Sequence, residues 1–220
     1  MYKRGDGRSC LRNLRSDMAV HLTLSRGVPV ESILLARFAS TSTMQIEHQA
    51  YEKQQHIDYS LYSVFPMAIT ADVLIAVAVS EKPVVKISNV NSSKFGSEEF
   101  EVPAEGEIPI DPENHSWTNY FKAGLRAGSE LLQKLRKQSS HFRSVGMDVL
   151  VDGTVPSGGG LSSSAAFVCS SALATLKANG EEVVDKKELT ELAIVSERAV
   201  GVNSGGYAPS NPFLYEPVLT

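Results

Sequence analysis

The stretch "VPSGGGLSSSAAF", Val155 to Phe167, places three consecutive glycines and then three consecutive serines directly before an apolar run. On its N-terminal side, "VGMDVLVDG" alternates apolar and polar residues as a β-strand does. On its C-terminal side, apolar residues recur at helical spacing, namely Ala165, Val168, Cys169, Ala172, Leu173 and Leu176. The stretch therefore predicts a strand, a glycine-rich turn and the start of a helix.

A turn of this kind is suited to binding a phosphate group. Glycine lets the backbone approach an anion closely, and the first turn of a helix offers free N–H groups and a positive dipole end. Serine hydroxyls add donors and can ligate Mg²⁺. The stretch is not a Walker A loop, because no lysine follows the glycines at the required position, and it lacks the G-x-G-x-x-G pattern. The alternative is a flexible connector whose serines cap the helix.

The periodicity on either side of this stretch indicates one α+β unit. Ser63 to Val79 reads as one or two buried strands, and "PVVKISNV" and "EEFEVP" as short strands with a hairpin-like link. A helix is expected from near Ser116 to "RKQSS", and a third helix from a capping box at Asp185 to Val200. Residues 1–54 show no sustained period and are expected to be irregular. We predict a mixed β-sheet with helices on one face.

The composition limits the class of partner. The chain is 42% hydrophobic and 21% charged, and its formal net charge of −4 gives no basic surface for a nucleic acid. The uncharged run from Thr154 to Leu176 is long enough to span a membrane but is rich in glycine and serine, so no membrane partner is expected. The two cysteines, Cys10 and Cys169, lie far apart, which fits a reducing compartment. We expect a cytoplasmic protein.

Three quoted segments resemble one kinase family. "PSGGGLSSSAA" resembles the P-x-x-x-G-L-x-S-S-A phosphate loop of the GHMP small-molecule kinases, which include galactokinase, homoserine kinase and mevalonate kinase. "HIDYSLYSVFPMAI", which begins at His56, looks like the second half of the galactokinase sugar-binding signature. "SERAVGVNSGG", which ends at Gly206, resembles the stretch before the catalytic G-G-x-D-Q of galactokinases. The resemblance is closest to fungal galactokinases.

The resemblance implies a domain organisation. Residues 55–206 would form a GHMP kinase N-terminal domain, with 1–54 an unassigned N-terminal segment and 207–220 an unassigned tail. The C-terminal kinase domain would be absent, which makes this a truncated chain by expectation.

The resemblance also implies roles for individual residues. His56 and Asp58 match the ligands of the sugar hydroxyl groups. The loop that binds the phosphates of ATP corresponds to Gly158, Gly159, Gly160, Leu161, Ser162, Ser163 and Ser164. One of Ser163 and Ser164, together with Glu197, would ligate Mg²⁺. For Glu197 the alternative is a solvated helix charge beside Arg198.

The resemblance also bears on two aromatic residues. The resemblance would let Trp117 and Tyr120 approach the adenine, but their helical spacing favours packing in the core.

The chain departs from the family pattern at three polar positions. Gln49 stands where the family has an arginine, and Gln55 where it has a glutamate. Ala208 stands where the catalytic aspartate belongs, so no catalytic residue is assigned. Alanine can neither orient a sugar hydroxyl nor accept its proton. We expect the chain to be inactive as an enzyme.

The resemblance implies galactokinase activity by descent. This reaction transfers the γ-phosphoryl group of ATP to the anomeric hydroxyl of D-galactose, giving galactose 1-phosphate, with ATP, Mg²⁺ and galactose as ligands. A related alternative is N-acetylgalactosamine kinase. A second is a sensor without kinase activity that binds galactose and ATP and engages a transcriptional repressor. Such sensors lack a Ser-Ala pair in the loop, and the presence of Ser164 and Ala165 favours the kinase lineage. A third alternative is a poorly folded chain without function.

Overall fold

The structure is a computed structural model that describes residues 33–44, 65–137, 143–157 and 161–201. Its strands form one five-stranded sheet in the order β1-β2-β5-β3-β4. The strands are β1 (Ile33–Met44), β2 (Phe65–Ser80), β3 (Val84–Asn89), β4 (Glu98–Glu101) and β5 (Gly146–Gly153). The described helices are α2 (Thr118–Leu135), α3 (Ser163–Ala178) and α4 (Lys186–Arg198).

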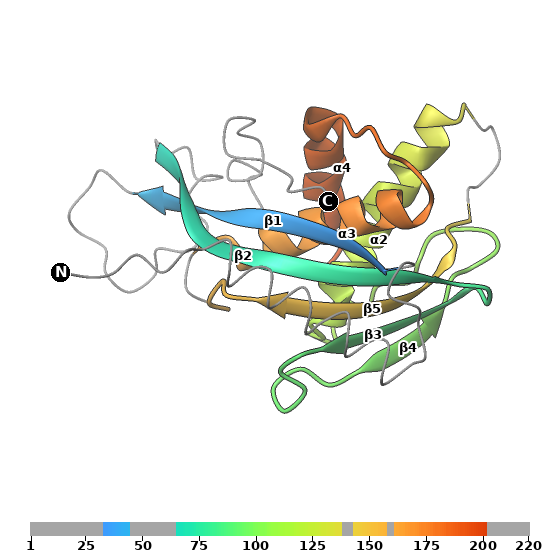
Figure 1. Ribbon diagram of the computed structural model, residues 1–220, viewed down its shortest axis with the longest axis horizontal. Coiled ribbons are helices and arrows are strands. Elements are labelled where there is room, and N and C mark those ends of the chain that lie inside the picture. Colours follow the sequence, from blue (N-terminus) through green and yellow to red (C-terminus); the bar gives the residue numbers. More distant parts are fainter. Residues whose placement is uncertain (1–32, 45–64, 138–142, 158–160, 202–220) are drawn as a thin grey trace.

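The sheet is mixed, and the helices cover one of its faces. β3 runs parallel to β5, while the other neighbouring pairs are antiparallel. Figure 1 shows α2, α3 and α4 on the same side of the sheet. The predicted α+β class, with helices on one face of a mixed sheet, is therefore confirmed.

Alternation along the central strands places the core between the sheet and the helices. Ile75 of β2 lies opposite Val151 of β5, and Val77 opposite Val149. On the other side of β5, Val85 of β3 lies beside Met147. All of these side chains are buried in one cluster with the helices. The position of β5 at the centre of the sheet fixes the point from which the glycine–serine stretch leaves it.

Helix α3 is enclosed on several sides. It packs against α2, α4 and the sheet, and even its polar residues Ser170, Ser171 and Thr175 are buried. Each of these hydroxyls donates a hydrogen bond to the carbonyl oxygen four residues earlier, at 2.7 to 2.9 Å. Because buried hydroxyl groups need partners, these internal bonds let a serine-rich helix occupy a central position.

The expectation of an irregular segment over residues 1–54 is wrong for Ile33–Met44, which forms β1. β1 pairs with β2 along most of its length, with a register shift between Ala39 and Thr41. This segment has no clean alternation in the sequence, and its conformation is fixed by a tertiary partner that local periodicity does not reveal. The rest of residues 1–54 lies outside the described part of the chain.

The remaining elements follow the sequence pattern closely. From Phe65 onward, the predicted apolar run forms one long strand, β2, and the two short strands form the antiparallel pair β3 and β4. Gly180 adopts a φ of +81° just after α3, which is the conformation expected of a glycine that ends a helix. The Asp185 side chain accepts hydrogen bonds from the backbone N–H groups of Lys187 and Glu188, so the predicted cap of α4 is confirmed.

Candidate functional site

The glycine–serine stretch joins the end of β5 to the start of α3, as predicted. Thr154 fixes the point where it leaves the sheet: its backbone N–H donates to the carbonyl oxygen of Asp72 at 2.9 Å, and its Oγ1 accepts from the Asp72 N–H at 3.1 Å. The structure describes this connection at 154–157 and again from Leu161, and residues 158–160 lie outside the described part. A strand, a connection and a helix start are thus in the order that a phosphate site requires.

The start of α3 has an uncommon backbone. Ser162 precedes the helix with φ 55° and ψ 40°, in the left-handed region that non-glycine residues rarely adopt. Its side chain makes no capping hydrogen bond, and the first turn of α3 contains no acidic residue. The alternative of a connector whose serine caps the helix is therefore not supported at Ser162. Ser163 and Ser164, both half-buried, occupy the first turn.

An aromatic group lies beside this helix start. The Trp117 ring stacks on Phe167 of α3, with ring centroids 5.8 Å apart, and contacts Phe95 at 5.6 Å. The indole N–H of Trp117 donates to the carbonyl oxygen of Gly96 at 3.0 Å. Both Trp117 and Tyr120 are partly buried and pack against the hydrophobic core, as their helical spacing predicted. Three elements thus meet here: the β3–β4 loop, α2 and α3.

Glu197 is buried, with only 2% of its surface exposed. The alternative of a solvated helix charge is therefore wrong. Burial raises the pKa of Tyr120 on α2, and the negative charge of Glu197 raises it further. The same two causes raise the pKa of Cys169. The spacing along α4 indicates that Glu197 is buried, because it follows Leu189 and Ala193 at steps of four along the buried face of this helix.

Several predicted site residues belong to segments that the structure does not describe. His56, Asp58, Gly158, Gly159, Gly160 and Ala208 lie outside the described residues, as do Gln49 and Gln55. The structure brings Ser162, Ser163 and Ser164 together at the start of α3, and positions Glu197 on a different helix.

Among the residues that can be described, no group of three or more His, Cys, Asp or Glu side chains could hold a metal ion. Within the same ranges, no helix is long and apolar enough to cross a membrane.

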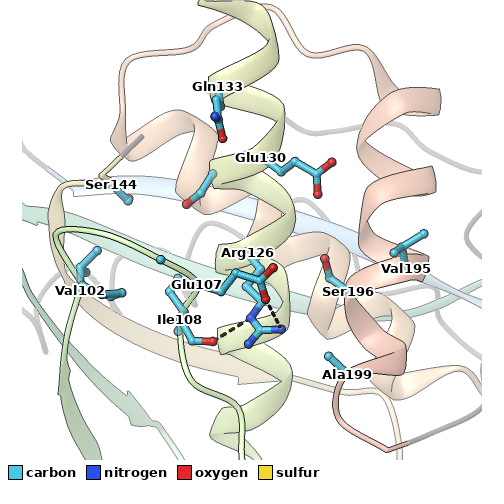
Figure 2. Close-up of a pocket in the computed structure, with 13 residues that line it drawn as sticks. Val102, Glu107, Ile108, Arg126, Glu130, Gln133, Ser144, Val195, Ser196 and Ala199 are labelled. Carbon is cyan, nitrogen blue, oxygen red and sulfur yellow. Dashed lines mark hydrogen bonds and ion pairs between the residues drawn. The ribbon is translucent and has the colours of Figure 1, made fainter. Parts of the chain in front are cut away.

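A cavity of about 360 Å³ lies elsewhere, between α2, α4 and the β4–α2 connection (Figure 2). The Arg126 Nε donates to the carbonyl oxygen of Ile108 at 2.7 Å, and its Nη1 lies 3.1 Å from Oε2 of Glu107. The guanidinium group is thus held and neutralised by its own neighbours. None of the residues assigned from the sequence lines this cavity, although Ser196, next to Glu197, does. We assign no function to it.

Family models match the chain in two places. The model described as the galactokinase galactose-binding signature matches residues 55–79. The model of the GHMP kinase N-terminal domain matches residues 119–215, which include the start of α3 and Glu197.

Known proteins match over more than half of the chain. The galactokinase of Candida parapsilosis is 46% identical over 151 residues, which cover 69% of this chain and 29% of that protein. The galactokinase of Saccharomyces cerevisiae is 42% identical over 160 residues, or 30% of its length. The chain therefore spans less than a third of these relatives. A galactokinase of Candida maltosa is 44% identical over 151 residues, which cover 67% of that protein.

Solved structures share the fold. Lactococcus lactis galactokinase complexed with galactose superposes with a TM-score of 0.64 at 23% identity, covering 89% of this chain and 45% of that one. Methanococcus jannaschii mevalonate kinase gives the same TM-score at 15% identity, covering 83% of this chain and 51% of that one. These two likenesses concern the fold alone. The identity to the yeast proteins and the two matched family models show that the chain belongs to the galactokinase family.

Proposed function

We propose that this chain provides the ATP-phosphate site of a galactokinase-type sugar kinase. The single observation that carries the proposal is the start of α3, where a left-handed Ser162 leads into a helix that has neither a side-chain cap nor an acidic first turn. The free N–H groups and positive dipole end of such a helix favour an anion. Gly158, Gly159, Gly160 and Leu161 would let the backbone of the loop approach the phosphates.

The reaction of the family would be transfer of the γ-phosphoryl group of ATP to the anomeric hydroxyl of D-galactose. Phosphoryl transfer depends chiefly on positioning and on neutralisation of charge at the phosphates. In this scheme the serine hydroxyls and helix N–H groups orient the triphosphate, and His56 and Asp58 hydrogen-bond the sugar hydroxyls. A carboxylate such as Asp58 can accept bonds from two neighbouring hydroxyls, which distinguishes one sugar epimer from another.

Mg²⁺ fits the donor types that the chain offers. This ion prefers oxygen ligands and is usually held by one or two carboxylates together with substrate phosphates and water. One of Ser163 and Ser164 would supply a hydroxyl, and Glu197, buried between the helices, would supply a carboxylate. When bound, the ion would offset the negative charge of the phosphates.

Ala208 favours a second candidate function, which is ligand binding without turnover. A chain with alanine at the position of the catalytic aspartate would keep the phosphate loop but lose the group that orients and deprotonates the sugar hydroxyl. A non-catalytic sensor of galactose and ATP that engages a transcriptional repressor would share this loss of turnover, whereas Ser164 and Ala165 favour the kinase lineage. A cytoplasmic location stays a prediction.

The single tryptophan of the chain allows a direct test of ATP binding. Trp117 stacks on Phe167, which lies one turn into α3, so a nucleotide bound at the start of α3 should change its fluorescence. We expect a saturable change on titration with ATP in the presence of Mg²⁺, and no comparable change with galactose alone. If neither fluorescence nor calorimetry detects ATP at millimolar concentration, the proposed function is wrong.

A further inference from the structure

The β3–β4 loop, residues 90–97, lies beside the start of α3 and is held by several contacts. Within the loop, the backbone N–H groups of Lys94 and Phe95 both donate to the carbonyl oxygen of Asn91, at 3.2 and 3.0 Å. The Phe95 ring contacts Trp117, whose indole N–H donates to Gly96. The loop is therefore held both by its own hydrogen bonds and by contacts with Trp117 at the start of α2.

This loop brings a lysine to the connection between β5 and α3. The Lys94 ammonium donates to Oγ of Ser157 at 2.8 Å, across 63 positions of sequence. The same ammonium lies 5.1 Å from the centre of the Phe95 ring, which favours its position through a cation–π contact. Lys94 is thus directed at Ser157 by the aromatic residue next to it in sequence.

The connection has no cation of its own. From Thr154 to Leu176 the sequence contains no charged residue, and no lysine follows the glycines as it does in a Walker A loop. A bound triphosphate carries several negative charges that must be offset by donors and cations. An ammonium group has three donors, of which the contact with Ser157 uses one.

We propose that Lys94 is the positioning residue that supplies the phosphate-binding connection with the cation that its own sequence lacks. Lys94 fixes Ser157 and places a positive charge beside the triphosphate. This inference rests on the proposed function, because it requires that the phosphates of ATP bind at this end of β5 and α3.

The test is calorimetric titration of the full chain with ATP and, separately, with adenosine, in the presence of Mg²⁺. Lys94→Gln should weaken ATP binding by about 3- to 10-fold, as for a charge-assisted bond at an exposed site. Adenosine, which has no phosphates, should bind equally well to both proteins. Lys94→Arg keeps the charge and should restore most of the affinity for ATP. The double variant Ser157→Ala with Lys94→Gln should lose less binding free energy for ATP than the two single variants lose in sum, because the two side chains interact with each other.

Lys86→Gln is the matched control. It removes the same charge from a lysine on β3 that pairs with Glu99 at 3.3 Å, and ATP affinity should stay unchanged. Three results would each overturn the role of Lys94 while leaving the proposed function intact. These are an equal loss of ATP affinity in Lys86→Gln, an equal loss of adenosine affinity in Lys94→Gln, and an unchanged ATP affinity in Lys94→Gln. Failure of the unmodified chain to bind ATP would instead overturn the proposed function, and the role of Lys94 with it.

Discussion

Gly124 of α2 lies so close to Ser171 of α3 that a Cβ atom on the glycine would lie 2.4 Å from the Cβ of the serine. It would also lie 2.5 Å from the carbonyl oxygen of Val168. The two helix backbones therefore pack together only because this position has no side chain. α3 begins with the serines of the candidate site, so the packing at Gly124 fixes where that site stands relative to α2.

Gly124→Ala should therefore destabilise the chain. Overpacking a core contact typically costs about 1–3 kcal/mol, which exceeds the gain of about 1 kcal/mol from replacing a helical glycine by alanine. We expect a net loss of up to about 2 kcal/mol in the free energy of unfolding, measured by urea denaturation. Gly96→Ala is the control, because a Cβ there meets nothing within 4 Å, and it should change stability by less than about 0.5 kcal/mol. Equal stabilities of the two variants would contradict the close packing.

Glu98 should make the stability of the chain depend on pH. Burial alone would raise the pKa of Glu98, but hydrogen bonds from Lys122 and Thr118 and the charge of Lys122 lower it below the ordinary value of 4.5. The ionised Glu98 carboxylate therefore stabilises the folded chain fully above pH 4.5. This stabilisation is lost as the pH falls through the lowered pKa that Glu98 has in the folded chain. The Lys122 Nζ lies 2.6 Å from the Glu98 carboxylate.

Glu98→Gln tests this dependence. The unmodified chain should be more stable than the variant at pH 7, and the difference should shrink steadily below pH 4.5 in urea denaturation experiments. Glu99→Gln removes an exposed partner of Lys86 and should have little effect at any pH. A difference between Glu98→Gln and the unmodified chain that stays constant from pH 7 to pH 3 would exclude the ionised pair as its cause.

Cys169 should be unreactive in the folded chain. Burial, together with the negative charge of Glu197, raises the pKa of the Cys169 thiol, and only a thiolate reacts readily with alkylating reagents. In a Cys10→Ser variant, which leaves Cys169 as the single thiol, we expect labelling at pH 8 only as fast as the chain unfolds. Addition of urea should accelerate it. Rapid labelling without denaturant would show that Cys169 is accessible.

The chain should not phosphorylate galactose. The resemblance predicts that Ala208 stands at the position of the catalytic aspartate, and that Gln49 and Gln55 stand at two polar positions of the sugar-binding signature. A general base or positioning group usually contributes about 10²–10⁴-fold to the rate, and several losses combine. We expect no galactose 1-phosphate above background after incubation with ATP and Mg²⁺. Turnover at the rate of an ordinary kinase would mean that Ala208 does not occupy the catalytic position.

The fold was predictable wherever local patterns determine an element. The alternation of β5, the helical face of α3 and the Asp185 cap each depend on residues close in sequence, and each was predicted. β1 was missed because its pairing partner, β2, follows it by more than twenty residues and its own pattern is irregular.

The candidate site was predictable only in part. The serines at the start of α3 were recognisable, because glycines and serines before a helix indicate an anion site. The contact of Lys94 with Ser157 was not predictable, because nothing in the "NSSKFGS" segment specifies which distant residue its lysine contacts. The burial of Glu197 could have been inferred from its spacing along α4, but not its proximity to Tyr120 and Cys169 on two other helices.

The claim that the start of α3 binds the phosphates of ATP is tested most directly by calorimetric titration with ATP and Mg²⁺. Three proteins are compared: the unmodified chain, the double variant Ser163→Ala with Ser164→Ala, and His56→Ala. We expect the unmodified chain to bind ATP, and the double variant to bind it more weakly by roughly 1–3 kcal/mol, as when hydrogen bonds to a charged group are lost. His56→Ala should leave ATP affinity nearly unchanged. Tight binding of galactose without any binding of ATP, or equal ATP affinity in all three proteins, would contradict the claim that the start of α3 is a phosphate site.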